Sequence, residues 1–468
     1  MTTSKKKIDD EEEDDDLDLR PKIKVKLPGA NRGKQIKSLR GMRDILPEEQ
    51  IYWDFVTQKA EESLKFYGFA KIDTPILEDL NLFVRGVGED TDIVGKEVFS
   101  FVDKGGEKVC LRPESTASVV RSYIEHGMIN QAQPVKLYYQ GPQFRHEKPQ
   151  SGRFRQFYQL GLEVIGDPDP IIDAQLILFA RNFLNELKLK FSIQVNSLGC
   201  KDCRKAYYKA LNDFYRPKKR FLCKDCQKRM LKNPLRLLDC KEEECQKIAE
   251  EVPQIVDYLC EDCNKHFVKV LEYLDELEIS YELNSKVVRG LDYYTKTIFE
   301  IWPISDDETK KISNGALGGG GRYDGLVEEL GGQPTPACGM AFGIERIISQ
   351  LKEQEIVFPQ AKGVDIFLVQ VGAAARKRCL SLFEELRINK IKVAESLSKN
   401  GLRPQLDKAN KLKAKYSLIL GQQELLDGTI IIRDMEDGTQ ETVNIDKVLD
   451  YVKKKTRTSK IKKTKLKK

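Results

Sequence analysis

Two segments rich in β-branched and aromatic residues, Val135 to Gln140 and Gln156 to Ile165, constrain the fold of this chain most strongly. Such runs are typical of strands, and the polar, basic stretch from Gly141 to Arg155 between them indicates a loop. Two strands joined in this way are expected to pair antiparallel. Upstream, apolar residues recur with helical spacing from Glu48 to Phe66, which predicts a long amphipathic helix. The expected fold class is α/β, with a large α+β domain whose antiparallel sheet is flanked by helices.

The second of these strands carries a polar face. Because side chains alternate along a strand, Gln159, Gly161 and Glu163 are expected on one side. The opposite side is filled by the apolar residues Leu160, Leu162 and Val164. A lone arginine in the preceding loop would be a surface residue in most proteins. Arg145 beside Gln159 and Glu163, however, indicates a half-buried polar site.

The middle of the chain is less regular. Residues near 198–274 carry many cysteines and a mostly helical pattern, which suggests an insertion. Strand patterns return at Lys286 to Val288 and Thr297 to Trp302, and a glycine-rich turn is expected at Gly318 to Gly321. A strand or turn that runs into a helix is expected from Gly339 to Leu351.

The pattern changes after Pro359. Strands that alternate with helices indicate a small α/β domain with a mostly parallel core. The predicted strands are Val364 to Val371, Ile391 to Ala394, Tyr416 to Leu420 and Thr429 to Arg433, with a helix at Ala375 to Ile388. The 468 residues are therefore expected to form a charged tail (1–36), a large domain (37–358, with the insertion at about 198–274), a second domain (362–452) and a basic tail (453–468).

The two ends of the chain carry opposite charge, although the net charge is only +6. Asp9 to Asp16 is an unbroken acidic run, and lysine dominates Lys453 to Lys468. Neither segment has apolar periodicity, so both are expected to be disordered. The basic end is either a solvated segment or a non-specific attractor of phosphate. With no secretory signal and no apolar run of roughly 18 residues, we expect a cytoplasmic protein without a membrane partner, and an organelle stroma or matrix stays open.

Cysteine is concentrated in the insertion. Three pairs have C-x-x-C spacing, and Cys240 and Cys245 lie between them. The pairs are Cys200 with Cys203, Cys223 with Cys226, and Cys260 with Cys263. In a reducing compartment this spacing suits zinc better than disulfides. The tetrad expected to hold a structural Zn²⁺ is Cys223, Cys226, Cys260 and Cys263, and the alternative is that these are ordinary small residues.

Two familiar nucleotide-binding loops do not occur in the sequence. No Gly-Lys pair is followed by Ser or Thr, so there is no Walker A loop. The glycines from Gly318 onward meet Tyr323 or Asp324 where the dinucleotide fingerprint needs its third glycine. Activation of a carboxylate by ATP would therefore depend on another scaffold, with arginines and metal ions that stabilise charge at the α-phosphate.

Five segments together resemble a known enzyme family. Tyr139 to Gly166, YQGPQFRHEKPQSGRFRQFYQLGLEVIG, resembles motif 2 of class II aminoacyl-tRNA synthetases in its histidyl form. Gly41 to Pro47 and the helix after it resemble motif 1, the dimer-forming element, and Gly339 to Arg346 resembles motif 3. Val288 to Tyr294 and Gly320 to Leu326 are similar to the two histidine signatures of histidyl-tRNA synthetases. Only the two tails fall outside the resemblance.

The resemblance implies a homodimeric ligase that activates L-histidine with ATP and Mg²⁺ and transfers it to tRNA(His). It implies that Arg145 and Arg289 are catalytic and contact the α-phosphate from two sides. ATP binding would also involve Arg346 at the γ-phosphate, with Glu147 and Gly343. The residues implied to bind histidine are Glu114, Ser115, Thr116, Arg145, Gln159, Glu163, Arg289, Tyr293 and Tyr294.

Within the histidine set, the resemblance divides the work. Glu114, Thr116 and Gln159 would hold the α-ammonium group. Glu163, Tyr293 and Tyr294 would recognise the imidazole, and a pocket that bonds both ring nitrogens rejects amino acids without them. The alternative for the two tyrosines is that they are strand-packing aromatics, which would face opposite sides.

One position departs from the family pattern. Ser115 stands in Arg112-Pro113-Glu114-Ser115-Thr116 where the family usually has glycine. Serine is small, so the loop is expected to keep its shape. If that glycine is needed for a positive φ, affinity for histidine would suffer.

Transfer RNA contacts are also implied by the resemblance. Gln150, Arg153 and Arg155 would meet the acceptor end, and the domain after residue 360 looks like the class II anticodon-binding domain. Two other functions remain open: a non-catalytic histidine-binding regulator of histidine biosynthesis, and a class II synthetase for glycine, threonine or proline. Arg145, Arg289 and Arg346 argue against the regulator, as does the second domain, and the histidine signatures argue against the other synthetases.

Overall fold

The computed structural model describes residues 35–88, 91, 93–148, 153–304, 315–356, 363–399 and 401–455. Nearly all of the two charged tails, 1–36 and 453–468, lies outside these residues, so their predicted disorder stays a prediction. The chain divides into two compact units, Met1–Phe358 and Pro359–Lys468.

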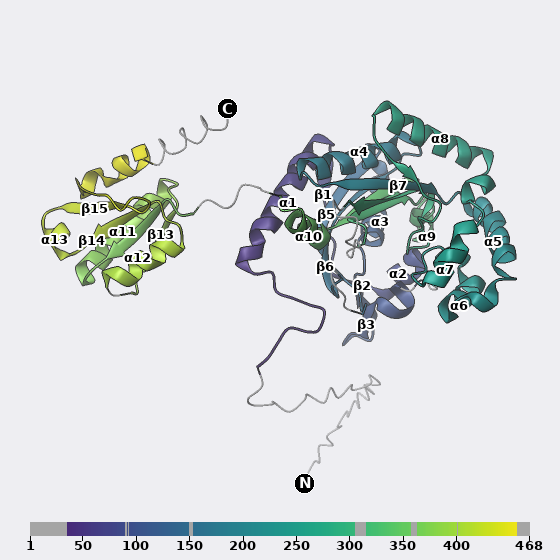
Figure 1. Ribbon diagram of the computed structural model, residues 1–468, viewed down its shortest axis with the longest axis horizontal. Coiled ribbons are helices and arrows are strands. Elements are labelled where there is room, and N and C mark those ends of the chain that lie inside the picture. The colour runs from purple at the N-terminus through teal and green to yellow at the C-terminus, as the bar shows by residue number, and fades with distance from the viewer. Residues whose placement is uncertain are drawn as a thin grey trace, which may run out of the picture. The chain divides into compact units, whose positions relative to one another are not determined.

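A largely antiparallel sheet of eight strands forms the centre of the first unit (Figure 1). Neighbouring strands pair antiparallel except at the two edges, where β1 with β5 and β7 with β8 run parallel. The antiparallel sheet expected from the sequence is confirmed. The strand order is β1 (Ala70–Lys71), β5 (Val135–Phe144), β6 (Gln156–Ile165), β11 (Ala337–Gly343), β10 (Gly318–Arg322), β9 (Thr295–Pro303), β7 (Phe191–Ser197) and β8 (Glu282–Leu283).

The central strand pair agrees with the sequence pattern. β5 and β6 pair in one continuous antiparallel register, from Val135 opposite Ile165 to Phe144 opposite Gln156. β5 is four residues longer than predicted, so the expected loop begins only after Phe144. Leu160, Leu162 and Val164 are buried in one hydrophobic core, as alternation requires.

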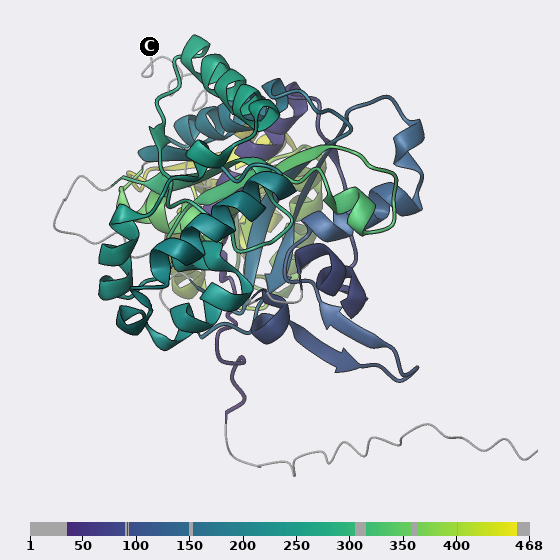
Figure 2. The same cartoon turned by 90° about the vertical axis from the view of Figure 1, so that its right-hand side faces the viewer.

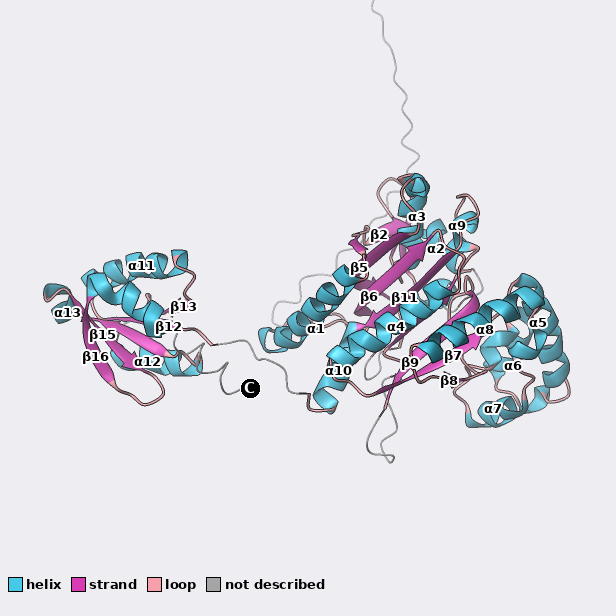
Figure 3. Cartoon of the chain, turned by 90° about the horizontal axis from the view of Figure 1, so that it is seen from above, coloured by secondary structure: helices cyan, strands magenta, loops and turns pink. Residues whose placement is uncertain are grey.

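Helices cover this apolar face of the sheet. Figure 3 shows α1 (Pro47–Phe66), α4 (Ile171–Glu186), α8 (Glu261–Glu276) and α10 (Ile344–Glu353) lying across the strands. α1 confirms the predicted amphipathic helix, and Pro47 suits its first turn because proline lacks the amide hydrogen that would be unpaired there. Residues of all four helices join the core that holds the apolar side chains of β6.

The other face of the sheet packs against a second core. This core contains odd-numbered side chains of β5, such as Leu137 and Tyr139, because these point to this face of the sheet. It also contains side chains of the helices that cover the face. Those helices are α2 (Leu80–Val87), α3 (Thr116–Glu125) and α9 (Leu326–Glu329). Beside them lies a three-stranded sheet of β2 (Leu77–Asp79), β4 (Lys108–Leu111) and β3 (Phe99–Val102), whose β3–β4 hairpin projects from the unit in Figure 2. Two single turns, η1 (Ile93–Glu97) and η2 (Met128–Asn130), complete this side.

Two predicted elements are wrong. Gly318 to Gly321 is not a turn but most of β10, which pairs with β9 on one side and β11 on the other. The three backbones lie so close that a Cβ atom at Gly320 would be 2.1 Å from the carbonyl oxygen of Gly339, so glycine is needed inside this strand. Lys286 to Val288 is not a strand either, and β9 begins only at Thr295.

The insertion is helical, as predicted. Figure 1 shows α5 (Lys201–Tyr215), α6 (Lys224–Lys232) and α7 (Glu243–Ile248) grouped at one end of the first unit. Short turns connect these helices to one another and to α8. The turns are η3 (Lys219–Phe221), η4 (Pro234–Leu237), η5 (Ala249–Glu251) and η6 (Ile255–Tyr258).

The second unit contains one five-stranded sheet with helices on both faces. Its order is β13 (Val393–Glu395), β12 (Ile366–Gln370), β14 (Tyr416–Leu420), β15 (Thr429–Asp434) and β16 (Gln440–Asn444). The first three strands pair parallel, β15 pairs antiparallel with β14, and β16 pairs antiparallel with β15. The predicted parallel core is therefore confirmed. Its helices include α11 (Ala373–Ile388), α12 (Leu402–Lys411) and α13 (Gln422–Leu426), and the turn η7 (Ile445–Lys447) leads into a further helix over residues 448–455.

None of the helices in the described ranges combines the length and the apolar character that crossing a bilayer would demand.

Candidate active site

A buried carboxylate closes the N-terminal end of α3. Glu114 accepts hydrogen bonds from the backbone amides of Thr116, at 2.7 Å, and Ala117, at 2.9 Å. Burial raises the pKa of Glu114, and these amide bonds oppose that rise. The carboxylate is therefore held in one orientation by the start of the helix, where exposed amide groups favour negative charge.

A second carboxylate, Glu163, lies on the polar face of β6. It accepts a hydrogen bond of 2.8 Å from the Thr116 hydroxyl and another from the Tyr323 hydroxyl. Burial, together with the nearby charge of Glu114, raises the pKa of Glu163 to about 8. Gly339 on β11 makes room for it, because a Cβ atom there would lie 1.8 Å from Oε2 of Glu163.

Three tyrosine rings enclose the space beside Glu163. The centroids of Tyr293 and Tyr294 lie 4.7 Å apart, and Tyr323 lies 5.5 Å from Tyr293 and 6.5 Å from Tyr294. Tyr293 and Tyr294 precede β9, so they are not strand residues that face opposite sides, and both are buried in the second hydrophobic core. Sequence reasoning assigned no role to Tyr323, although it lies inside the second histidine signature.

Gln159 lies two residues before Gly161 on the same strand face. Its side-chain oxygen is buried and has no hydrogen-bond partner among the residues that the structure describes. Gly161 makes room for the Tyr139 ring, since a Cβ atom there would lie 2.1 Å from Cζ of Tyr139. A buried acceptor without a donor is a site at which a ligand can supply one.

Arg145 follows the end of β5 directly. Its Nε donates a hydrogen bond of 3.0 Å to the carbonyl of Pro113, and its guanidinium lies 5.3 Å from the centroid of the Phe157 ring. These contacts hold the side chain beside the loop that contains Glu114.

Arg289 lies in the segment before β9, and its guanidinium is held by two neighbouring side chains. It forms an ion pair of 2.9 Å with Glu300 of β9 and lies 5.3 Å from the centroid of Tyr294. Its Nε is buried without a partner in the described part of the chain. This leaves one guanidinium donor available to an acceptor from a ligand.

Arg346 comes from the first turn of α10. It donates a hydrogen bond of 2.6 Å to the carbonyl of Ala316. Gly343, the N-cap of this helix, lies against it, since a Cβ atom at Gly343 would be 3.4 Å from Cδ of Arg346.

The arginines predicted to act together share one electrostatic environment. Burial lowers the pKa of Arg346, and the positive charges of Arg153 and Arg145 lower it further, while Glu147 and Glu300 oppose this. Glu300 is also the ion-pair partner of Arg289. Three guanidinium groups from distant parts of the chain therefore lie within electrostatic reach of one another, and Arg289 lies over the Tyr294 ring.

The loop between β5 and β6 is held by its own arginines. Arg153 forms a 2.9 Å ion pair with Glu147, and Nε of Arg155 donates to the carbonyl of Glu147 at 3.2 Å. Gln150, also predicted to contact transfer RNA, lies outside the described residues.

Ser115 occupies its position without strain. Its φ is −115° and its ψ is −8°, a conformation that any residue adopts, so glycine is not required. The fully buried hydroxyl accepts a hydrogen bond of 2.7 Å from Nε2 of Gln143 on β5. The departure from the family pattern therefore adds a link between the α3 loop and the sheet.

The predicted zinc tetrad is wrong. Cys223 and Cys226 do not meet Cys260 and Cys263. Instead, two separate groups of four thiols form, each with all sulfur atoms within 4.8 Å of one another. Their members are Cys200, Cys203, Cys260 and Cys263 in the first cluster and Cys223, Cys226, Cys240 and Cys245 in the second. The fold brings the start of α8 to the start of α5, a contact that sequence spacing does not reveal.

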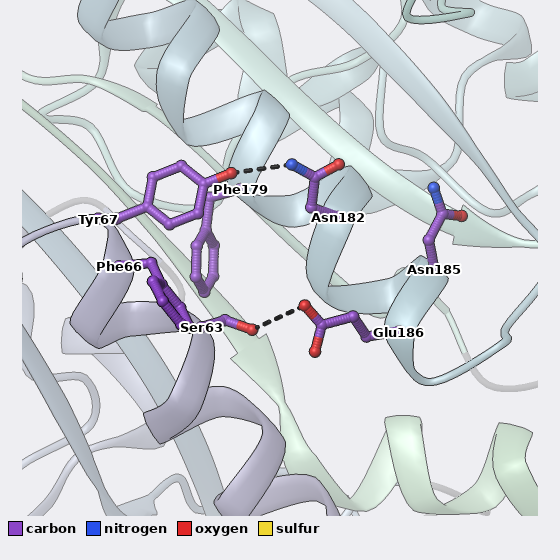
Figure 4. A pocket seen from close by; sticks show the side chains of 7 residues that line it. All are labelled: Ser63, Phe66, Tyr67, Phe179, Asn182, Asn185 and Glu186. Atoms are coloured by element: carbon purple, nitrogen blue, oxygen red, sulfur yellow. Dashed lines mark hydrogen bonds between the residues drawn. The ribbon is translucent and has the colours of Figure 1, made fainter.

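A pocket of about 520 Å³ lies between α1 and α4, apart from these residues (Figure 4). Its polar groups already pair with one another: Asn182 donates to the Tyr67 hydroxyl at 2.9 Å, and Ser63 donates to Glu186 at 3.3 Å. It contains none of the predicted site residues.

Comparison with known proteins gives the same match over both units. The family described as histidyl-tRNA synthetase matches residues 41–347, and the family described as anticodon binding domain matches residues 364–455. A histidine–tRNA ligase of Dehalococcoides mccartyi is 46% identical over 419 residues, which are 89% of this chain and 99% of that protein. The histidine–tRNA ligase of Pelotomaculum thermopropionicum is 44% identical over 418 residues, 89% of this chain and 97% of that protein.

A solved structure is similar over the same length. The apo histidyl-tRNA synthetase of S. aureus shares 36% sequence identity with this chain, at a TM-score of 0.75. The similarity covers 90% of this chain and 100% of that one.

Proposed function

The chain belongs to the histidyl-tRNA synthetase family, and from this premise we propose how its site carries out the reaction. It is a histidine–tRNA ligase, which joins L-histidine to tRNA(His) with ATP through a histidyl-adenylate, releasing diphosphate and AMP. The observation that carries the proposed site is the electrostatic proximity of Arg145, Arg289 and Arg346, with Arg289 over the ring of Tyr294.

Histidine is proposed to bind with its imidazole toward Glu163 and the tyrosines. Glu163 supplies an acceptor for a ring N–H, and the Tyr293, Tyr294 and Tyr323 rings close the space around it. The α-ammonium group then lies near Glu114, Thr116 and the unpaired Gln159 oxygen. Side chains without a ring N–H would forgo the hydrogen bond to Glu163, which supports selection for histidine.

ATP is proposed to bind with its α-phosphate between Arg145 and Arg289. A carboxylate oxygen of histidine attacks the α-phosphorus and forms a new P–O bond. The bond between the α-phosphorus and the bridging oxygen of the leaving diphosphate breaks. Negative charge that develops on the α-phosphate oxygens is met by the two guanidinium groups, including the unpaired Nε of Arg289. Arg346 is assigned to the γ-phosphate, with Glu147 and Gly343 beside the nucleotide. Mg²⁺ would accompany ATP and supply positive charge that helps to neutralise its phosphates.

Transfer RNA is proposed to meet both units. The loop with Arg153 and Arg155 lies next to the proposed nucleotide site and is assigned to the acceptor end, where phosphate contacts position and base contacts specify. The second unit, as a member of the anticodon-binding domain family, is assigned to the anticodon. We also propose a homodimer formed through Gly41–Pro47 and α1, a cytoplasmic location, and structural zinc in the insertion.

A non-catalytic histidine-binding regulator is not favoured. The match to histidine–tRNA ligases includes the anticodon-binding domain, and all three arginines are present. Histidine-dependent exchange of radioactive diphosphate into ATP tests the proposal. Exchange with histidine, and not with glycine, threonine or proline, is expected. Histidine binding without exchange would overturn it.

A further inference from the structure

The two thiol clusters have the spacing of single tetrahedral metal sites. Zinc–thiolate bonds of about 2.3 Å place the sulfur atoms of a tetrahedron about 3.8 Å apart. The Sγ atoms of Cys200 and Cys203 lie 3.5 Å apart in the first cluster, and those of Cys223 and Cys240 lie 3.9 Å apart in the second. The first distance is slightly shorter, and the second slightly longer, than the sulfur–sulfur distance of an ideal zinc–thiolate tetrahedron.

The surroundings of each cluster also stabilise thiolates, the deprotonated form of cysteine. Cys200, Cys223 and Cys260 are the N-caps of α5, α6 and α8, where the helix dipole favours a thiolate. Backbone amides point at sulfur in both clusters. These amides are Cys260 N to Cys203 Sγ at 3.1 Å, Cys226 N to Cys223 Sγ at 3.4 Å and Cys223 N to Cys245 Sγ at 3.3 Å.

Other uses of the eight thiols fit less well. None of them forms a disulfide, and the sulfur separations of 3.5 and 3.9 Å are far above the roughly 2.05 Å of an S–S bond. In a multi-iron cluster the thiolates are divided among two or more irons, so some of them lie farther apart than ligands of one ion, whereas all four sulfur atoms of each cluster lie within 4.8 Å of one another. Four sulfur ligands on one ion leave no open coordination position, so such an ion is structural.

The first cluster lies next to Arg204, a residue that bonds to residues 289–294. We call these residues the histidine-reading loop because they contain Tyr293 and Tyr294. Arg204 follows Cys203 directly in α5. Its Nη1 donates to the carbonyl oxygens of Asp292 and Tyr294, both at 3.3 Å. Displacement of the first turn of α5 would therefore move the carbonyl that precedes β9, together with the Tyr294 ring.

The second cluster supports another contact to the same loop. α6 begins at the Cys223 cap and ends at Asn233, whose Nδ2 donates to Oδ1 of Asp292 at 2.8 Å. The insertion thus bonds both the backbone carbonyl and the carboxylate of Asp292. The two donors belong to α5 and to the end of α6, and each of these helices begins at a thiol cluster.

We propose that the insertion binds two zinc ions, one in each thiol cluster, and that these ions position the histidine-reading loop through Arg204 and Asn233. The metal assignment rests on the clusters alone, whereas the effect on histidine rests on the proposed function.

Metal analysis of the whole protein, purified from zinc-supplemented cells without chelator, tests the first part. Two equivalents of zinc per chain are expected. Cys203→Ser and Cys226→Ser should each retain one, and Cys379→Ser, which changes a buried cysteine of the second unit, should retain two. Zinc-free wild-type protein, or iron in place of zinc, would overturn the assignment. This readout does not depend on activity, so it separates the metal sites from the proposed function.

Arg204→Ala tests the positioning role without touching a ligand. It should keep both zinc ions, raise KM for histidine about tenfold in diphosphate exchange and change kcat much less, because the pocket is misplaced rather than removed. Arg204→Lys, which keeps a donor, should recover part of the loss. An unchanged KM for histidine in Arg204→Ala, whether or not kcat falls, would overturn the link to the loop.

Discussion

Tyr323 donates its phenolic hydrogen to Oε2 of Glu163, although the two residues are 160 positions apart in the chain. The bond joins β6 to the segment after β10 and fixes the carboxylate that we assign to the imidazole. Thr116 occupies the other oxygen at 2.8 Å, so both oxygens of Glu163 are oriented before histidine arrives.

Tyr323→Phe should weaken histidine selection. The change leaves one oxygen of a buried carboxylate without its donor, which costs about 1–3 kcal/mol and corresponds to roughly 5–150-fold in kcat/KM for histidine. Diphosphate exchange measures this. Tyr281→Phe, which removes an exposed hydroxyl bonded to Asp275, serves as the control and should leave exchange unchanged. Equal activity of Tyr323→Phe and wild type would show that the bond does not orient Glu163 for substrate.

Histidine binding should release protons near pH 7. With the pKa of Glu163 raised to about 8, its carboxyl group is mostly protonated at pH 7 in the substrate-free protein. The positively charged ammonium group and the imidazole donor favour the carboxylate, so binding expels that proton. Affinity should therefore rise as pH increases toward about 8 and level off above it.

Calorimetry at pH 7 in two buffers of different ionisation enthalpy measures the release. We expect Glu163 to release about one proton, whereas free imidazole itself supplies only about a quarter of a proton. Glu163→Gln should bind more weakly and lose most of the release. Binding without proton release in the wild-type protein would contradict the assignment.

The same pKa also predicts how stability depends on pH. The unfolded chain loses the Glu163 proton near pH 4.5, whereas the folded protein keeps it until about pH 8. Because the folded state binds more protons in this window, the contribution of Glu163 to the free energy of unfolding falls as pH rises from 4.5 to 8. Denaturant titrations of wild type and Glu163→Gln at pH 5 and pH 8 should show a smaller decrease for the variant. Parallel decreases would contradict the raised pKa.

Arg289→Ala should separate catalysis from histidine binding. Loss of a guanidinium that meets charge on the α-phosphate is expected to reduce exchange about 10²–10³-fold, while the dissociation constant for histidine changes far less. Exchange kinetics and equilibrium dialysis give the two values. Arg387→Ala, an exposed change in the second unit, is the control. Equal losses of exchange and binding would refute the role of Arg289 at the phosphate.

Ser115→Gly should reduce stability without abolishing function. The backbone at Ser115 is unstrained, so glycine gains nothing from its freedom, and Gln143 loses a buried acceptor at 2.7 Å. We expect the free energy of unfolding to fall by about 1–3 kcal/mol in denaturant titration, with KM for histidine within about threefold of wild type. A tenfold gain in histidine affinity would instead show that the serine impairs the pocket.

The amino-acid sequence by itself determined the elements whose patterns are local. The alternation of Gln159 and Glu163 with apolar neighbours predicted the polar face of β6, and the spacing from Glu48 to Phe66 predicted α1, because burial of one face imposes its period on the sequence. The motifs also identified the arginines, although they did not show how the chain would bring them together.

Tertiary structure alone decided the features that depend on partners distant in sequence. Gly318 to Gly321 form a strand against the preference of glycine, because two neighbouring backbones leave no room for side chains. Tyr323 joins Glu163 only because β10 and β11 carry it to β6, and Cys260 joins Cys200 rather than Cys223 because α8 begins beside α5. Spacing along a chain limits which contacts are possible, but packing of the helices and strands selects among them.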